Sequence, residues 1–90
     1  MKNGVDCIRE ERERQIAKYG YTPGHDTIYT DGELLRAAMA YIQQALYPGL
    51  KPLGEVWPFV KDFFKDEGYK RSLEKAGALI AAEIDRVNLS

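Results

Sequence analysis

Residues 76–82 read AGALIAA, and every side chain in this segment is small or apolar. The segment sits inside a longer apolar pattern that predicts a helix over residues 69–88. We expect one narrow stripe of this helix to face the core, formed by Tyr69, Leu73, Ala76, Gly77, Ile80, Ile84 and Val87. Because small residues permit close helix packing, we expect Ala78, Leu79 and Ala82 to contact a second copy of the chain.

A second helix is predicted to begin at the segment TDGE, residues 30–33, which fits a capping box with Thr30 as the N-cap. Pro48-Gly49 stops it after Leu46 or Tyr47. Its apolar residues cover more than half of its circumference, which predicts contact with more than one neighbour. These residues are Leu34, Leu35, Ala37, Ala38, Met39, Tyr41, Ile42, Ala45 and Leu46.

A first helix is predicted over residues 6–19, with Asp6 as the N-cap and Gly20 as the stop. Its inner face is sparsely apolar, and Arg12 and Gln15 project onto it. We expect both to be buried and hydrogen-bonded, because an unpartnered buried guanidinium costs several kcal/mol. Arg12 pairs with Glu33 or Asp26, or lies at the edge of the helix with its charged end in solvent, or lines a pocket and contacts an anionic ligand. On the outer face, Glu10 and Arg14 have i,i+4 spacing.

The remaining segments complete a single all-α domain over residues 1–90, with three main helices and one short helix. Residues 20–30, GYTPGHDTIYT, are predicted to form a loop. Residues 48–58, PGLKPLGEVWP, are predicted to form an extended connection, and residues 59–65, FVKDFFK, the short helix. A chain of this size buries only a modest core, so we expect a homo-oligomer.

The composition disfavours several classes of protein. The 13 basic and 14 acidic residues nearly balance, which argues against a duplex nucleic-acid binder. With Cys7 the only cysteine and His25 the only histidine, neither an internal disulfide nor a zinc site is expected. We expect no metal and no cofactor. The sequence shows neither a signal peptide nor an apolar run of membrane-spanning length, which favours a cytoplasmic location and no membrane partner.

Several strings in the sequence resemble a family of small phage and prophage proteins, most of which have no assigned mechanism. These strings are ERERQIAKYGYTPGHD, GELLRAAMAYIQQAL, WPF and KRSLEKAGALIAAEIDR. The likeness covers nearly the whole chain outside residues 48–56. It departs from the family pattern after Trp57-Pro58, where a second aromatic residue, often Trp, is Phe59. The resemblance implies a phage-encoded accessory protein in the cytoplasm of a bacterial host cell.

Seven residues are candidates for ligand binding: Arg12, Gln15, His25, Trp57, Tyr69, Arg71 and Lys75. The aromatic residues near Trp57 are candidates for stacking on a base, and the cations of the last helix for holding phosphates. Each has a structural alternative: the aromatic residues fill the core, and His25 and Asp26 stabilise their loop. The spacing Ser72-x-x-Lys75 matches a nucleophile motif by letter only, because its companion motifs are missing.

Three functions follow from this pattern. The first, which combines the aromatic and cationic residues with the phage resemblance, is a non-catalytic sponge for a nucleotide-derived signal of bacterial immunity. The alternative is an adaptor that binds and inhibits a host protein through an exposed helix. The third is a helical nucleotide pyrophosphatase. Glu10-x-x-Glu13 has the carboxylate spacing of such enzymes but is predicted to face solvent.

Overall fold

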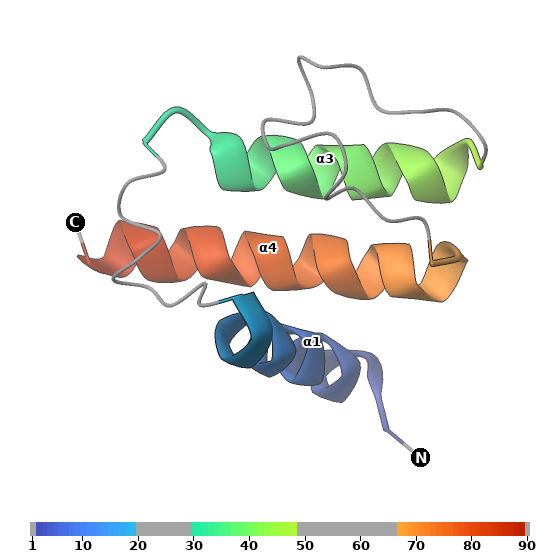
Figure 1. Cartoon of the computed structure of the whole chain (residues 1–90), viewed down its shortest axis with the longest axis horizontal. Helices are drawn as coiled ribbons and strands as arrows, with labels where there is room; N and C mark the ends of the chain where they lie inside the picture. The colour runs from blue at the N-terminus through green and yellow to red at the C-terminus, as the bar shows by residue number, and fades with distance from the viewer. Residues whose placement is uncertain (1, 20–29, 49–66, 90) are drawn as a thin grey trace.

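The computed structural model describes residues 2–19, 30–48 and 67–89 of the chain. These residues form three helices and no strand: α1 (Gly4–Tyr19), α3 (Glu33–Leu46) and α4 (Tyr69–Leu89). Figure 1 shows α4 in the middle, with α3 running antiparallel along one side and α1 crossing on the other. Among these helices, α1 and α3 each contact α4 and do not contact one another. The predicted all-α class is confirmed.

The start of α1 is a reciprocal cap built by Asn3 and Asp6. The Asn3 side-chain oxygen accepts a bond from the Asp6 backbone N–H at 2.8 Å, and the Asp6 carboxylate accepts one from the Asn3 N–H at 3.3 Å. The prediction that Asp6 is the N-cap was therefore wrong, since Asp6 is the third helical residue. The two side chains satisfy N–H groups that the first turn leaves without partners.

The start of α3 also differs from its prediction. Gly32 is the N-cap, with φ 77°, and no side chain caps the helix. This left-handed conformation suits glycine and turns the chain into the helix directly at Glu33. Thr30 then lies too far upstream to be the N-cap. In the predicted capping box, the Glu33 carboxylate would accept a bond from the backbone N–H of Thr30. It accepts one from the N–H of the next residue, Asp31, at 2.7 Å.

The ends of the helices agree closely with the sequence. α1 ends at Tyr19 and α3 at Leu46, where the Tyr47 N–H donates to the Gln43 carbonyl at 2.8 Å. α4 begins at Tyr69 after Gly68, whose φ is 98° and whose carbonyl accepts from the Ser72 N–H at 3.0 Å. The predicted short helix over residues 59–65 lies outside the described residues, as do residues 20–29 of the predicted loop and residues 49–58 of the predicted connection.

The core between α3 and α4 is made largely of alanine. The only buried large apolar side chains of these helices are Leu34, Tyr41 and Leu79, and the rest of the buried apolar set is Ala37, Ala38, Ala40, Ala45, Ala76, Ala78 and Ala82. Leu79 and Ala82 join one cluster with residues of α3. The predicted second-copy interface at Ala78, Leu79 and Ala82 was wrong, because these residues are at most 4% exposed within one chain.

Most of the large apolar residues of α3 and α4 lie outside this core. We name the following eight residues the apolar face: Leu35, Met39, Ile42 and Leu46 of α3, and Leu73, Ile80, Ile84 and Val87 of α4. Each is between 39% and 64% exposed. The prediction that the α4 stripe faces the core was therefore wrong for its large residues, whereas Ala76 of that stripe is buried in the core. Periodicity identifies two apolar sides of a helix, but small side chains allow the closer approach, so the alanine side is the one that packs on α3.

α1 packs directly against α4 at Gly77. A Cβ atom built on Gly77 would lie 2.7 Å from Cδ1 and 2.8 Å from Cγ1 of Ile8. Because Gly77 has no side chain, the Ile8 side chain can pack against the backbone of α4 where the two helices cross. The expected close approach at this segment occurs between two helices of one chain. No described helix is both long and apolar enough to cross a membrane.

We predict that Gly77→Ala destabilises the protein despite the better helix propensity of alanine. Overpacking costs about 1–3 kcal/mol, and alanine regains about 1 kcal/mol over glycine inside a helix. In an Ile8→Ala background the same substitution should instead stabilise by about 1 kcal/mol, because the contact is gone. Urea unfolding of the four variants measures this cycle. An effect of the same sign in both backgrounds would contradict the close contact.

Candidate functional site

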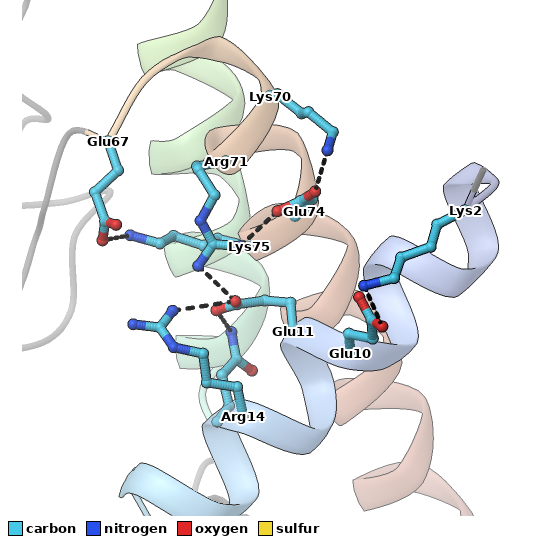
Figure 2. A network of polar contacts seen from close by, with 10 residues as sticks. Lys2, Glu10, Glu11, Arg14, Glu67, Lys70, Arg71, Glu74 and Lys75 are labelled. Carbon is cyan, nitrogen blue, oxygen red and sulfur yellow. Dashed lines mark hydrogen bonds and ion pairs between the residues drawn. The ribbon is translucent and has the colours of Figure 1, made fainter.

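A buried carboxylate joins α1 to α4. The side chain of Glu11 is 2% exposed and accepts bonds from three side chains (Figure 2). The Arg71 guanidinium lies 2.6 Å away and the Arg14 guanidinium 3.2 Å away, while the Gln15 amide nitrogen lies at 3.4 Å. An ionised carboxylate is stable in a buried position only when it is paired and hydrogen-bonded. Arg14 and Gln15 lie on α1 with Glu11, so of the three contacts it is the one with Arg71 that holds α1 against the first turns of α4.

Arg71 is the bridge of this network. Its second guanidinium nitrogen donates to Glu74 at 2.5 Å, and Lys70 approaches the same carboxylate at 3.4 Å. Glu74 is itself buried, with a side chain that is 11% exposed. Figure 2 shows Arg71 pointing between Glu74 of its own helix and Glu11 of α1. The guanidinium thus holds two carboxylates that would otherwise repel one another.

Lys75 extends the network toward α3. Its ammonium group donates to the Glu67 carboxylate at 2.5 Å and lies 5.3 Å from the centre of the Tyr41 ring. The side chain of Lys75 is 8% exposed. A partly desolvated ammonium over an aromatic face gains a cation–π attraction in addition to its ion pair. Lys75 therefore connects the amino-terminal end of α4 to the core.

The ion pairs shift the acidity of their members. The hydrogen bond from Lys75 lowers the pKa of Glu67. Burial by itself raises the pKa of Glu74, but hydrogen bonds from Arg71 and Lys70 outweigh it, and the pKa is lowered overall. For Arg71, burial by itself lowers the pKa. The hydrogen bonds to Glu11 and Glu74 outweigh this effect, and the pKa of Arg71 is raised overall. All three shifts favour the charged forms.

A surface cavity of about 390 Å³ opens beside this network. It is lined by Cys7, Glu10, Glu11, Arg14, Glu67, Arg71 and Glu74. Each of its four carboxylates has a cationic partner, and that of Glu10 is Lys2, at 2.8 Å. The predicted Glu10–Arg14 pair gives way to the pairing of Arg14 with Glu11. Any charged ligand entering the cavity must therefore compete with an ion pair already formed.

The predicted burial of Arg12 and Gln15 is confirmed, with 7% and 5% of each residue exposed. Arg12 pairs with Asp85 of α4 at 3.3 Å and not with Glu33, its candidate partner within the described residues. Gln15 donates to Glu11. Neither residue lines the cavity.

The remaining candidates fall into two groups. Tyr69, Arg71 and Lys75 share the first two turns of α4. Tyr69 is 65% exposed, whereas Arg71 and Lys75 have the intramolecular partners described above. His25 and Trp57 lie outside the described residues.

Sequence analysis missed Glu11, Glu67 and Glu74 as members of the site. The i,i+4 spacing of Glu11 and Gln15 was the available signal, because it places Glu11 as a third polar residue on the face of α1 that already carries Arg12 and Gln15. Nothing in the sequence pairs Glu11 with Arg71, which lies sixty positions away. The partner is set by the crossing of α1 over α4.

The described residues show no arrangement for nucleophilic or metal-assisted chemistry. The Ser72 residue is 1% exposed, its hydroxyl has no hydrogen-bond partner, and Lys75 is bound to Glu67. Glu10 and Glu13 are exposed on α1. Within these residues no three His, Cys, Asp or Glu side chains gather as a metal site requires.

Comparison with known proteins yields no relative: no family model, no curated protein and no solved structure matches the chain.

We predict that Arg71→Met destabilises the fold by about 3 kcal/mol, because it leaves the buried Glu11 carboxylate short of its closest partner. The double variant Glu11→Met/Arg71→Met should lose less, since removing both charges removes the cost of burying one of them. Urea unfolding compares the two. The control Arg9→Met alters an exposed pair with Asp6 and should change stability by less than about 0.5 kcal/mol. A double variant less stable than the single one would contradict this account.

The network also predicts a dependence of stability on pH. Glu67 and Glu74 have folded-state pKa values below their ordinary 4.5. Their contribution is therefore complete above pH 4.5 and is lost as the pH falls through the lowered folded-state values. The urea midpoint should stay level on this account from pH 7 to pH 5 and then fall. Glu74→Gln should show a smaller acid loss than the wild type, while Glu13→Gln, at an exposed position, should match the wild type.

Proposed function

We propose that this chain is a phage-encoded, non-catalytic binding protein that captures a small nucleotide-derived signalling molecule of bacterial immunity. The observation that carries the proposal is the composition of the first turn of α4. An exposed aromatic residue and two cations follow one another there, as Tyr69, Lys70 and Arg71, and the turn contains no acidic residue. An aromatic ring beside cations at a helix amino terminus combines the groups that hold a base and a phosphate.

Tyr69 supports the base-binding half of the proposal. It is 65% exposed, so its ring is available on the surface rather than used in the core. Stacking of a base on an aromatic ring contributes about 1–3 kcal/mol and needs no sequence-specific contacts. A free nucleotide derivative, which has an unpaired base, is suited to such a platform.

Arg71 and Lys70 support the phosphate-binding half. A guanidinium has five N–H donors, and Glu11 and Glu74 engage only two of its nitrogens while 30% of the Arg71 side chain stays exposed. The carboxylates therefore fix the direction of the guanidinium in advance of ligand binding. The Lys70 side chain is 78% exposed and adds a mobile charge. The amino-terminal end of the helix dipole also favours an anion at this position.

The same geometry limits the role of other residues. A phosphate that reaches Arg71 competes with two carboxylates, so affinity has to come from Tyr69 and Lys70 as well. Lys75 is engaged by Glu67 and Tyr41. In this proposal Lys75 and Arg12 hold the helices in place, and Tyr69, Lys70 and Arg71 contact the ligand.

Calorimetry with cyclic dinucleotides and ADP-ribose derivatives tests the proposal on the full chain. We expect one of them to bind with micromolar or tighter affinity and to be recovered intact. Tyr69→Ala should weaken binding by about ten-fold or more, and Lys70→Ala should also weaken it. Tyr69→Phe, which keeps the ring, and Lys18→Ala, on an exposed position of α1, should leave the affinity unchanged.

Three outcomes count against the proposal. Absence of binding across the panel removes the sponge function. Binding that is insensitive to Tyr69→Ala and Lys70→Ala places the ligand elsewhere. Recovery of a cleaved ligand favours the pyrophosphatase instead.

A second candidate function, inhibition of a host protein, is favoured by a different observation. The apolar face exposes eight large side chains over α3 and α4, and exposed apolar patches of this extent mark protein contacts. A stoichiometric complex between a purified host protein and this chain, abolished by Met39→Asp and unaffected by Lys70→Ala, would establish it.

A further inference from the structure

In α3 and α4, small apolar residues fill most of the core, and most of the large apolar residues are exposed. Alanine fills the α3–α4 core, while the eight larger residues of the apolar face lie outside it. Burial stabilises in proportion to apolar area, at about 25 cal/mol per Å². The α3–α4 core contains only three large apolar residues, Leu34, Tyr41 and Leu79, whereas each residue of the apolar face leaves between 39% and 64% of its surface exposed in the single chain.

The two halves of the apolar face lie on the same side of the helix pair. On α3 each exposed residue directly follows a buried one, as in Leu34 and Leu35 or Tyr41 and Ile42. On α4 the same order holds for Leu79 and Ile80. One residue is a rotation of about 100°, always in the same sense along the chain. Because α3 and α4 run antiparallel (Figure 1), equal rotations from their shared contact bring both stripes to one side.

The chemistry of this surface selects an apolar occupant. None of its eight residues carries a charge or a hydrogen-bonding side chain. The charged network of Figure 2 involves other positions of α4, namely Lys70, Arg71, Glu74 and Lys75. The apolar face offers no charged group to a partner that is recognised through charge. A second copy of the chain presents an equally apolar surface, so the two faces can bury one another without leaving a charge unpaired.

The size of the surface is compatible with a stable dimer. The apolar face extends from Leu35 to Leu46 on α3 and from Leu73 to Val87 on α4, which is about 17 and 21 Å at 1.5 Å per residue. With helices about 10 Å wide, the face measures roughly 400 Å² in projection. That lies within the range of the largest apolar patch found on typical monomers, about 300–600 Å², which is often functional. Protruding side chains expose more area than their projection, and standard interfaces bury about 800 Å² per partner.

We propose that a second copy of the chain covers the apolar face. Two α3–α4 pairs pack face to face about a two-fold axis and form a four-helix bundle whose new core is built by the eight residues of each copy. This interface differs from the one predicted at Ala78, Leu79 and Ala82, which are used within the chain. The proposal does not depend on nucleotide capture, since it rests on other residues.

Sedimentation equilibrium of the full chain tests this proposal. The wild type should have twice its 10.2 kDa mass, and its melting temperature should rise with protein concentration, as mass action requires. Ile80→Glu should weaken dimerisation by at least about 100-fold, because each copy would bury an unpaired charge, while the circular dichroism of the helices persists. Ala17→Glu, a matched charge at an exposed position of α1, should remain dimeric.

The contrary results are equally definite. A wild type that stays monomeric up to about millimolar concentration, with a melting temperature independent of concentration, overturns the proposal and leaves the face to a host protein or to another part of the chain. An Ile80→Glu variant that remains as dimeric as Ala17→Glu overturns it as well, because the dimer would then use another surface. If Ile80→Glu loses its helicity and the wild type forms no dimer, the proposal is also overturned, because Ile80 then only supports the fold of the single chain.

Discussion

Both α1 and α3 bury their inner faces against a single helix, α4, and this shared support is the constraint from which the other features follow. A helix that is packed on two sides needs small residues where its neighbours come close. Gly77 provides that room for Ile8 of α1, and Ala78 and Ala82 provide it within the alanine-lined interior. Leu79 is buried in the core, whereas Leu73, Ile80, Ile84 and Val87 of α4 are left on the side that neither helix covers.

An alanine core explains why the crossing of α1 relies on charges. α1 offers α4 few apolar side chains, and its buried positions are Glu11, Arg12 and Gln15. Glu11 pairs with Arg71 near the start of α4, and Arg12 pairs with Asp85 near its end. Two ion pairs separated along one helix fix both the register and the angle of the other. Breaking either ion pair leaves a buried charge without its partner on α4, so α1 can pack on α4 in few alternative arrangements.

This division of labour separates two surfaces. In the network around Arg71 each carboxylate has a cationic partner, and an exposed tyrosine and lysine lie at the amino-terminal end of α4. The apolar face lies over α3 and α4 and shares no residue with that network. The proposed ligand capture and the proposed self-association therefore involve different residues. Each surface follows from which sides of α4 are covered by α1 and α3.

The sequence by itself determined the helical class, the ends of the three described helices to within a few residues, and the burial of Arg12 and Gln15. These properties depend on local spacing, on turn residues and on the cost of burying charge. It did not determine which apolar side of α4 faces inward, nor that Gly32 rather than Thr30 starts α3. It also left unassigned the pairings of Glu11 with Arg71 and of Arg12 with Asp85. Those depend on how closely two backbones approach and at what angle, and distant segments settle this only when they pack together.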